Sequence, residues 1–401
     1  MLHTVIMAGG SGFRFWPYSR VKKPKQLLKL FSDKSLILET VERLEPLVPK
    51  ENIHISTNPF LGGLIKKELK GVKYVIEPLP KNTAACIGLS AISIMKEDPE
   101  AIMFVETSDH VYKDPAAYLD CIRKAAIAAR RDKIVLVGIK PTFAHTGLGY
   151  IQFGELFDED IPDLHHIETF KEKPDLKTAK EFLEDGRYLW NAGLFISKCS
   201  VMLEEIRRYM PNLYNGLMKI KESDFDEEVL KEVFENIEGK SIDYGVMERS
   251  NNTVVINADM HWDDIGDFLA VQRYHPKDER KNISLCEYEG NATRCILLSQ
   301  TRKIIANNVT ELVVADTEDA TLICTKPEIL NIKKVVEKIK EAGLDQYLDD
   351  YVEDHKKNII SYESDECDIE TNGLIVLMGV SELDIKRTDK ELIIEGVVQD
   401  V

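Results

Sequence analysis

Apolar and polar positions along the first 140 residues follow a repeating pattern of short apolar runs and longer segments with helical spacing. Val5 to Ala8 predicts a buried strand, and Leu36 to Leu47 predicts a helix. Further strands are predicted over 53–56, 74–76, 101–106 and 134–138, and further helices over 61–69, 83–96 and 116–130. Strands that alternate with helices predict a mainly parallel sheet with helices on both faces.

The pattern loosens between residues 140 and 275 but stays mixed. A hairpin is predicted over 149–170, and Trp190 to Ile196 is typical of a turn that leads into a strand. Helices are predicted over 176–185, 201–209, 225–234 and 241–247, and a strand over 253–258. We therefore expect one α/β domain over residues 1–275.

From about Pro276 the helical spacing gives way to short β runs, which predict a smaller β-rich domain over 276–345. One charged helix over 329–342 is expected to close it. Residues 346–401 are expected to form a polar linker and a small β tail, with strands over 374–378 and 392–398. The tail contains no catalytic cluster, and packing or subunit contact is its favoured role.

Composition narrows the class of protein. The chain has 401 residues, 44% of them hydrophobic and 30% charged, which is typical of a soluble globular protein. No apolar run approaches the roughly 18 residues of a membrane span, and the N-terminus lacks the features of a signal peptide. Seven scattered cysteines favour reduced thiols and a cytoplasmic location. The net charge of −17 argues against nucleic-acid binding.

The candidate chemistry begins directly after the first strand. Glycines 9, 10 and 12 let the backbone approach a ligand closely, and successive N–H groups in such a loop suit phosphate oxygens. Arg14 and Lys25 add positive charge, within a basic cluster that is the exception in an acidic chain. The alternative is an ordinary glycine turn, but the added cations favour a nucleotide site.

Two acidic motifs follow predicted strands. Asp109, in Thr107-Ser108-Asp109-His110, and Asp264, in the pair Asp263-Asp264, are carboxylates suited to Mg²⁺. Each motif alone is more typical of a helix cap or a turn. Their joint occurrence with a phosphate loop favours a shared metal site.

Three further motifs are ambiguous by themselves. Asn82 and Thr83 fit a helix N-cap as well as hydrogen bonding to a nucleobase. Glu172 and Lys173 fit a solvated charge run as well as a ligand contact, and Asn191 fits a turn.

Together these motifs resemble the sugar-phosphate nucleotidylyltransferases. Trp16-Pro17-Tyr18-Ser19-Arg20 and Pro24-Lys25-Gln26 are similar, in particular, to the mannose-1-phosphate guanylyltransferase family. The motifs match in order over roughly residues 1–345; those after the first stretch are 77–84, 108–110, 170–174, 190–193, 241–244 and 262–266. The chain departs from the family pattern at Phe13, at Glu106-Thr107, at Asp263 and at Asp267-Phe268. The resemblance implies a Rossmann-like (GT-A-like) nucleotidyltransferase fold with a mixed, mainly parallel sheet.

The resemblance also implies a role for each matching residue. Nucleotide binding is expected at Ala8, Gly9, Gly10, Gly12, Arg14, Lys25, Asn82, Thr83 and Ser108. Arg14 and the glycines would bind phosphates, Lys25 the phosphates that leave, and Asn82 and Thr83 would lie near guanine and ribose. Gly149, Glu172 and Asn191 would bind mannose hydroxyls, and Lys173 the sugar phosphate. Asp109 and Asp264 would ligate Mg²⁺, and Arg14, Lys25 and Lys173 would be the catalytic residues.

The expected reaction joins GTP and mannose 1-phosphate to give GDP-mannose and pyrophosphate by in-line attack at the α-phosphorus. No general base is required, because the attacking phosphate has a second pKa of about 6. Two alternatives stay open: a uridylyl- or thymidylyltransferase acting on another sugar 1-phosphate, and a non-catalytic nucleotide-sugar sensor. We expect small molecules as partners, with no nucleic acid and no membrane, and a homodimer as an open alternative to a monomer.

Overall fold

In the computed structural model the chain divides into two compact units, Met1–Gly9 with Ile37–Asp264 and Gly10–Leu36 with Ile265–Val401. The structure describes residues 1–10, 12–352, 358–362, 367–371, 373–380 and 383–396. These units differ from the three predicted domains, because the glycine-rich segment packs within the second unit and the tail shares that unit's sheets.

A nine-stranded mixed sheet forms the centre of the first unit, in the order β3-β2-β1-β4-β9-β6-β10-β8-β7. Six strands have a parallel neighbour: β1 (Leu2–Met7), β2 (Ile53–Thr57), β3 (Lys73–Ile76), β4 (Ile102–Thr107), β6 (Ile134–Ile139) and β10 (Thr253–Ala258). The strands β7 (Tyr150–Leu156), β8 (Leu164–Lys171) and β9 (Tyr188–Lys198) are antiparallel to their neighbours. The prediction of a mainly parallel sheet therefore holds for six strands, and β9 interrupts it at the centre.

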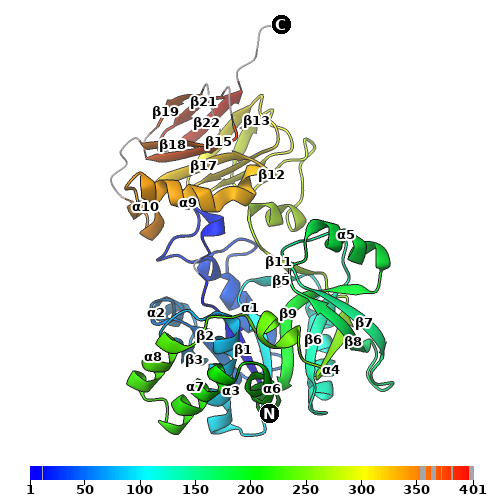
Figure 1. Ribbon diagram of the computed structural model, residues 1–401. Coiled ribbons are helices and arrows are strands. Elements are labelled where there is room, and N and C mark those ends of the chain that lie inside the picture. The colour runs from blue at the N-terminus through cyan, green and yellow to red at the C-terminus, as the bar shows by residue number, and fades with distance from the viewer. Residues whose placement is uncertain (11, 353–357, 363–366, 372, 381–382, 397–401) are drawn as a thin grey trace. The chain divides into compact units, whose positions relative to one another are not determined.

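In the first unit, helices pack against this sheet or against one another, as Figure 1 shows. They are α1 (Leu36–Leu44), α2 (Pro59–Glu68), α3 (Asn82–Glu97), α4 (Pro115–Ala129), α5 (Leu176–Asp185), α6 (Cys199–Tyr209), α7 (Pro211–Glu222) and α8 (Glu227–Asn236), with a 3-10 turn at Lys50–Asn52 and a π-helical turn at Asp243–Met247. The α7 helix was not predicted, although its Leu213, Leu217 and Ile220 are buried in the core. Asp114 caps α4 by accepting hydrogen bonds from Ala116 N and Ala117 N, so Asp109 is not that helix's cap.

A short two-stranded ribbon was also not predicted. It consists of β5 (His110–Tyr112) and β11 (Trp262–Asp264), which pair antiparallel. Both strands have only three residues, too few to show an alternating pattern.

The second unit contains two further sheets. One has the order β12 (Ile283–Ser284), β14 (Ile296–Ser299), β16 (Leu312–Asp316), β17 (Ala320–Thr325), β20 (Leu374–Met378), β18 (Asn358–Tyr362). The other has the order β13 (Tyr288–Gly290), β15 (Lys303–Asn307), β22 (Glu391–Gly396), β21 (Leu383–Arg387), β19 (Cys367–Glu370). Apolar side chains from both sheets form one core that includes Val314, Leu377 and Ile394. The tail is therefore part of this β structure, which corrects the expectation of a separate small sheet.

The helical elements of the second unit are α9 (Ile332–Glu341), α10 (Gln346–Asp349) and 3-10 turns at Phe13–Phe15, Lys25–Leu27, Phe268–Arg273 and Glu328–Asn331. Tyr347 and Leu348 are buried, so the predicted linker begins with packed residues; residues 353–357 of that linker, and 397–398 of the last predicted strand, lie outside the described part. In the described part of the chain, each helix is too short or too polar to cross a membrane. All seven cysteines are free thiols.

Candidate functional site

The two candidate metal ligands lie in neighbouring positions in the first unit. Ser108 and Asp109 form the turn that follows β4, and His110 then begins β5. His110 pairs with Asp264 in the ribbon, and opposed residues of antiparallel strands have Cα atoms only about 4.5–5.5 Å apart. Trp262 Nε1 also donates a hydrogen bond to His110 Nδ1 at 3.1 Å. The ribbon therefore brings the backbone of Asp109 close to that of Asp264.

A buried ion pair supports this ribbon from behind. Arg43 on α1 donates through Nη2 to His110 O at 3.3 Å, and its Nη1 lies 3.3 Å from Glu106 Oε1. Glu106 also accepts hydrogen bonds from the hydroxyls of Tyr112 and Tyr118. Burial raises the pKa of Glu106, although Arg43 and the two phenols oppose that rise. Glu106, a departure from the family pattern, is thus a paired residue that fixes the position of the Asp109 turn.

The donor set fits a divalent cation that shares its ligands with phosphate. Mg²⁺ is commonly bound by one or two carboxylates, with substrate phosphates and water completing the shell. Asp264 is exposed and Asp109 is partly buried, so this end of the ribbon has both carboxylate and solvent access. Among the described residues no group of three or more His, Cys, Asp or Glu side chains could hold a metal by itself.

Glu172 is the centre of the predicted sugar-binding residues, all of which lie in the first unit. Its carboxylate is only 6% exposed, and Oε1 accepts a hydrogen bond from Lys173 Nζ at 2.7 Å. Oε2 is buried and has no hydrogen-bond partner within the described residues. A Cβ at Gly149 would lie 2.5 Å from that oxygen, so only glycine leaves it room.

The other predicted sugar-side residues adjoin this carboxylate. Asn191 N donates to Gly149 O at 2.8 Å, and the same hypothetical Cβ would lie 3.3 Å from Asn191 Cβ. Burial lowers the pKa of Lys173, but its hydrogen bond to Glu172 and the charge of that carboxylate raise it more, so the net shift is upward. The structure thus brings Gly149, Glu172, Lys173 and Asn191 together.

Asp243 is a member of this group that the sequence prediction missed. Its Oδ1 accepts a hydrogen bond from Asn191 Nδ2 at 2.9 Å. Burial raises the pKa of Asp243 to about 6, and the charge of Glu172 adds to the rise. The motif Ser241 to Tyr244 was noted in the sequence, but no local pattern shows that its carboxylate faces Asn191.

The predicted base-side residues lie at the start of α3. Asn82 is the first residue of the helix, adopts a left-handed φ of 66° and accepts a hydrogen bond from Thr83 N, whereas Lys81 occupies the N-cap position. Thr83 Oγ1 instead accepts from Ile242 N at 2.9 Å, which links α3 to the residue before Asp243. Asn82 is exposed, and its contact with a base stays a prediction.

Ala8 and Ser108 lie at the carboxyl ends of β1 and β4. Ala8 is hydrogen-bonded to Ser56 O and to the Thr57 hydroxyl, and Ser108 N donates to Met7 O at 3.2 Å. Gly9 is exposed directly beyond Ala8. These residues occupy the strand ends where ligands bind in open α/β sheets.

The remaining phosphate-binding candidates, Gly10, Gly12, Arg14 and Lys25, belong to the second unit. Gly12 has a φ of +66°, and a Cβ there would overlap with Lys25 Cβ. Arg14 is exposed, whereas Lys25 is only 7% exposed and donates to Ile265 O. Gln26 Nε2 donates to Gly10 O at 2.9 Å. Gly12 is thus packed against Lys25 and Gly10 is hydrogen-bonded to Gln26, while phosphate binding by these residues stays a prediction.

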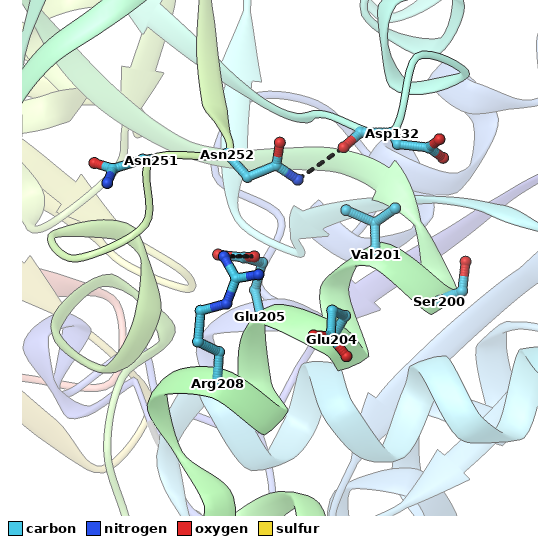
Figure 2. Close-up of a pocket in the computed structure, with 8 residues that line it drawn as sticks. All are labelled: Asp132, Ser200, Val201, Glu204, Glu205, Arg208, Asn251 and Asn252. Carbon is cyan, nitrogen blue, oxygen red and sulfur yellow. Dashed lines mark hydrogen bonds and ion pairs between the residues drawn. The ribbon is translucent and has the colours of Figure 1, made fainter.

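A cavity of about 510 Å³ lies elsewhere in the first unit, lined by Asp132, Ser200, Val201, Glu204, Glu205, Arg208, Asn251 and Asn252 (Figure 2). It adjoins the start of α6 and the residues before β6, at the amino ends of the parallel strands. Its polar side chains pair with one another, as in Arg208 with Glu205, and none of the predicted site residues lines it.

Comparison with known proteins gives consistent matches. A profile described as nucleotidyl transferase matches residues 3–281. A mannose-1-phosphate guanylyltransferase of Salmonella muenchen is 34% identical over 358 residues, covering 86% of this chain and 74% of the relative. Mannose-1-phosphate guanylyltransferase 2 of Escherichia coli O157:H7 is 31% identical, with coverages of 86% and 74%. A solved structure from Thermus thermophilus, described as a mannose-1-phosphate geranyltransferase, is 30% identical with a TM-score of 0.76, and covers 84% of this chain and 99% of that one.

Proposed function

The chain belongs to the nucleotidyl transferase family, and on that premise we propose that it makes GDP-mannose and pyrophosphate from GTP and mannose 1-phosphate. The relatives named as mannose-1-phosphate guanylyltransferases support the choice of substrates. We propose Mg²⁺ as the cofactor and, from the free cysteines, a cytoplasmic location; a homodimer stays a prediction.

The observation that carries the proposal is Glu172 Oε2, which has no hydrogen-bond partner in the described part of the chain. A buried carboxylate oxygen without a hydrogen bond costs free energy, which a ligand hydroxyl would recover. Asn191 and Asp243 place an amide and a second carboxylate nearby, and Gly149 leaves the space. Such a group of acceptors and donors suits a sugar, which presents several hydroxyls at fixed spacing.

The proposed reaction forms a bond between an oxygen of mannose 1-phosphate and the α-phosphorus of GTP, and it breaks the bond from that phosphorus to the pyrophosphate oxygen. Lys173 would bind the attacking phosphate, which needs no general base because it is already a dianion near neutral pH. Arg14 and Lys25 would stabilise the charge on the departing pyrophosphate. Asp109 and Asp264 would hold Mg²⁺, which when bound neutralises charge on the phosphate oxygens.

The test is pyrophosphate release in the presence of Mg²⁺ with each of GTP, ATP, UTP and dTTP, combined with mannose 1-phosphate or glucose 1-phosphate. We expect GTP with mannose 1-phosphate to give the highest kcat/KM. A preference for UTP or dTTP would favour the sister enzymes, and no turnover with any pair would favour the sensor.

The metal assignment has its own variant. Asp109→Ala should lower kcat by about a hundredfold or more, by analogy with the loss of other charge-stabilising groups. Asp259→Ala, at a 97% exposed carboxylate of the same unit, is the matched control. Normal turnover by Asp109→Ala would contradict the assignment.

A further inference from the structure

The segment 345–352 runs alongside residues 16–22 of the glycine-rich segment, within the second unit. Val21 N donates to Leu348 O and Lys22 N to Asp349 O, both at 2.9 Å. Tyr347 O accepts hydrogen bonds from Trp16 Nε1, at 2.9 Å, and from Arg20. In Figure 1 the glycine-rich segment of the second unit, in dark blue, lies beside α9 and α10. We call residues 345–352 the clasp.

A buried carboxylate joins the clasp to the glycine-rich segment. Asp319, in the turn between β16 and β17, accepts from Arg20 Nη2 at 2.9 Å through Oδ1 and from Val352 N at 3.0 Å through Oδ2. Arg20 and Asp319 are both fully buried. The Asp319 side chain thus holds both the clasp and the glycine-rich segment.

The turn that carries Asp319 is itself tightly held. Arg302 Nη1 donates to Thr317 O at 2.7 Å, and Arg387 Nη2 donates to the same carbonyl at 2.8 Å. Both arginines also pair with Asp316. Arg387 lies on β21, so a strand of the C-terminal tail supports the turn.

The contact continues from Arg20 to the phosphate-binding candidates. Ser19, adjacent to Arg20, donates through Oγ to Gly12 O at 2.8 Å. Gly12 packs directly against Lys25, so a shift at Arg20 reaches Gly12 and Lys25 through a single side chain. Fixed geometry of this kind matters for catalysis because misplacing a group by about 1 Å can cost a hundredfold in rate.

We propose that Asp319 and the clasp are a positioning device for the nucleotide-binding residues of the glycine-rich segment, and that the C-terminal tail therefore acts on nucleotide binding. This inference rests on the proposed function. It predicts weaker binding of the nucleoside triphosphate and of pyrophosphate when the contact is broken. Binding of the sugar phosphate should not change, because the residues predicted to bind it lie in the first unit.

The first test is Asp319→Asn in the full chain, assayed for both substrates. We expect KM for GTP to rise about tenfold, with KM for mannose 1-phosphate within twofold of wild type. Glu311→Gln, which breaks an exposed ion pair with Arg294 in the same unit, should change neither KM. An unchanged KM for GTP, or an equal rise in both KM values, would overturn the proposal.

A double variant separates positioning from stability. Arg20→Met with Asp319→Leu replaces the buried ion pair by apolar side chains, a change that is often neutral or stabilising. We expect the double variant to have the Tm of the wild type but a raised KM for GTP. If the ion pair had only a structural role, both the Tm and the KM for GTP of the double variant would match the wild type. This pair of readouts also decides the matter if Asp319→Asn does not fold.

Direct binding distinguishes failure of this inference from failure of the proposed function. Calorimetric binding of GTP with Mg²⁺ to wild type and to the double variant requires no turnover. If the wild type makes no GDP-mannose, the proposed function fails, and weaker GTP binding by the double variant still supports the clasp. Equal GTP binding by the two proteins overturns the clasp alone.

Discussion

Two lysines proposed to bind phosphate, Lys173 in the first unit and Lys25 in the second, are held in different ways. Lys173 is 53% exposed and forms an ion pair with the Glu172 carboxylate. Lys25 is almost fully buried and donates to a neutral main-chain carbonyl, that of Ile265. Solvent and a counter-charge therefore weaken the field of Lys173, whereas burial and the hydrogen bond to the carbonyl fix the position of the Lys25 ammonium group.

The same contrast extends to the residues around each lysine. In the first unit, side chains hold side chains, as in Asn191 with Asp243 and Arg43 with Glu106. In the second unit, main-chain carbonyls such as Tyr347 O and Thr317 O hold the buried arginines together with the carboxylates of Asp316 and Asp319. The first arrangement suits recognition of the hydroxyl groups of a sugar. The second suits a rigid cationic loop in a chain whose net charge is −17.

The largest expected effect tests this contrast directly. Lys25→Ala should lower kcat by about a hundredfold or more, because it removes a fixed charge from the departing pyrophosphate. Lys173→Ala should lower kcat less and mainly raise KM for mannose 1-phosphate. Steady-state pyrophosphate release measures both, with Lys29→Ala at an exposed position as the control. Equal losses from the two variants would show that the modes of support make no difference.

The next effect concerns the space beside Glu172. Gly149→Ala places a Cβ 2.5 Å from Oε2, so the carboxylate must move away from its position. We expect KM for mannose 1-phosphate to rise about tenfold with KM for GTP unchanged, as for the loss of about one charge-assisted hydrogen bond. Gly63→Ala, whose Cβ would meet nothing within 4 Å, is the control. An unchanged KM for the sugar phosphate would remove Glu172 from the site.

A smaller effect is expected behind the candidate metal ligands. Glu106→Leu leaves Arg43 without its carboxylate and should loosen the turn at Asp109, raising the Mg²⁺ concentration for half-maximal rate severalfold. Glu106→Gln keeps an acceptor for the hydroxyls of Tyr112 and Tyr118. Its Mg²⁺ concentration for half-maximal rate should therefore lie between those of Glu106→Leu and the wild type. The same Mg²⁺ dependence in all three proteins would confine Glu106 to a structural role.

Sequence periodicity predicted the elements whose partners are near or whose pattern is long. The bounds of β10, β20 and α5 are as predicted, since each is a continuous run with a clear period. The α7 helix was missed because Pro211 and Gly216 are typical of breaks, although Pro at the first helical position is well tolerated. The tail's place in the second unit could not be predicted, because β15 and β22 pair across more than eighty residues.

The candidate site shows the same limit. Sequence motifs named the residues that the structure brings together around Glu172, but they did not show that Asp243 faces Asn191. Nor did they show that the glycine-rich segment packs with the β-rich unit, because Arg20 and Asp319 are 299 positions apart. Local patterns identify chemical groups, whereas their support comes from long-range pairing that leaves no local signal.

The last prediction has the smallest effect on turnover and concerns the pH dependence of the first unit. His54 and His3 lie at the amino ends of β2 and β1, with His3 Nδ1 and His54 Nε2 3.2 Å apart. Burial, together with the charge of His3, lowers the pKa of His54 from 6.5 to about 4. A histidine that is neutral in the folded state contributes stability above pH 6.5, and that contribution is lost as pH falls toward 4. At pH 5 the loss is about 2 kcal/mol of unfolding free energy, from the two pKa values.

His54→Gln should flatten this dependence between pH 8 and pH 5 while leaving kcat at pH 8 unchanged, because His54 lies at the opposite end of the strands from Asp109. Urea unfolding in a Trp16→Phe background measures this pH dependence of the unfolding free energy. The remaining tryptophans, Trp190 and Trp262, both belong to the first unit, so their signal reports the unfolding of that unit. His261→Gln, at an exposed histidine of that unit, should keep the wild-type slope. If His54→Gln also keeps the wild-type slope of unfolding free energy with pH, the acid sensitivity comes from other groups. The pair of His3 and His54 would then give the first unit no acid sensitivity that the second unit lacks.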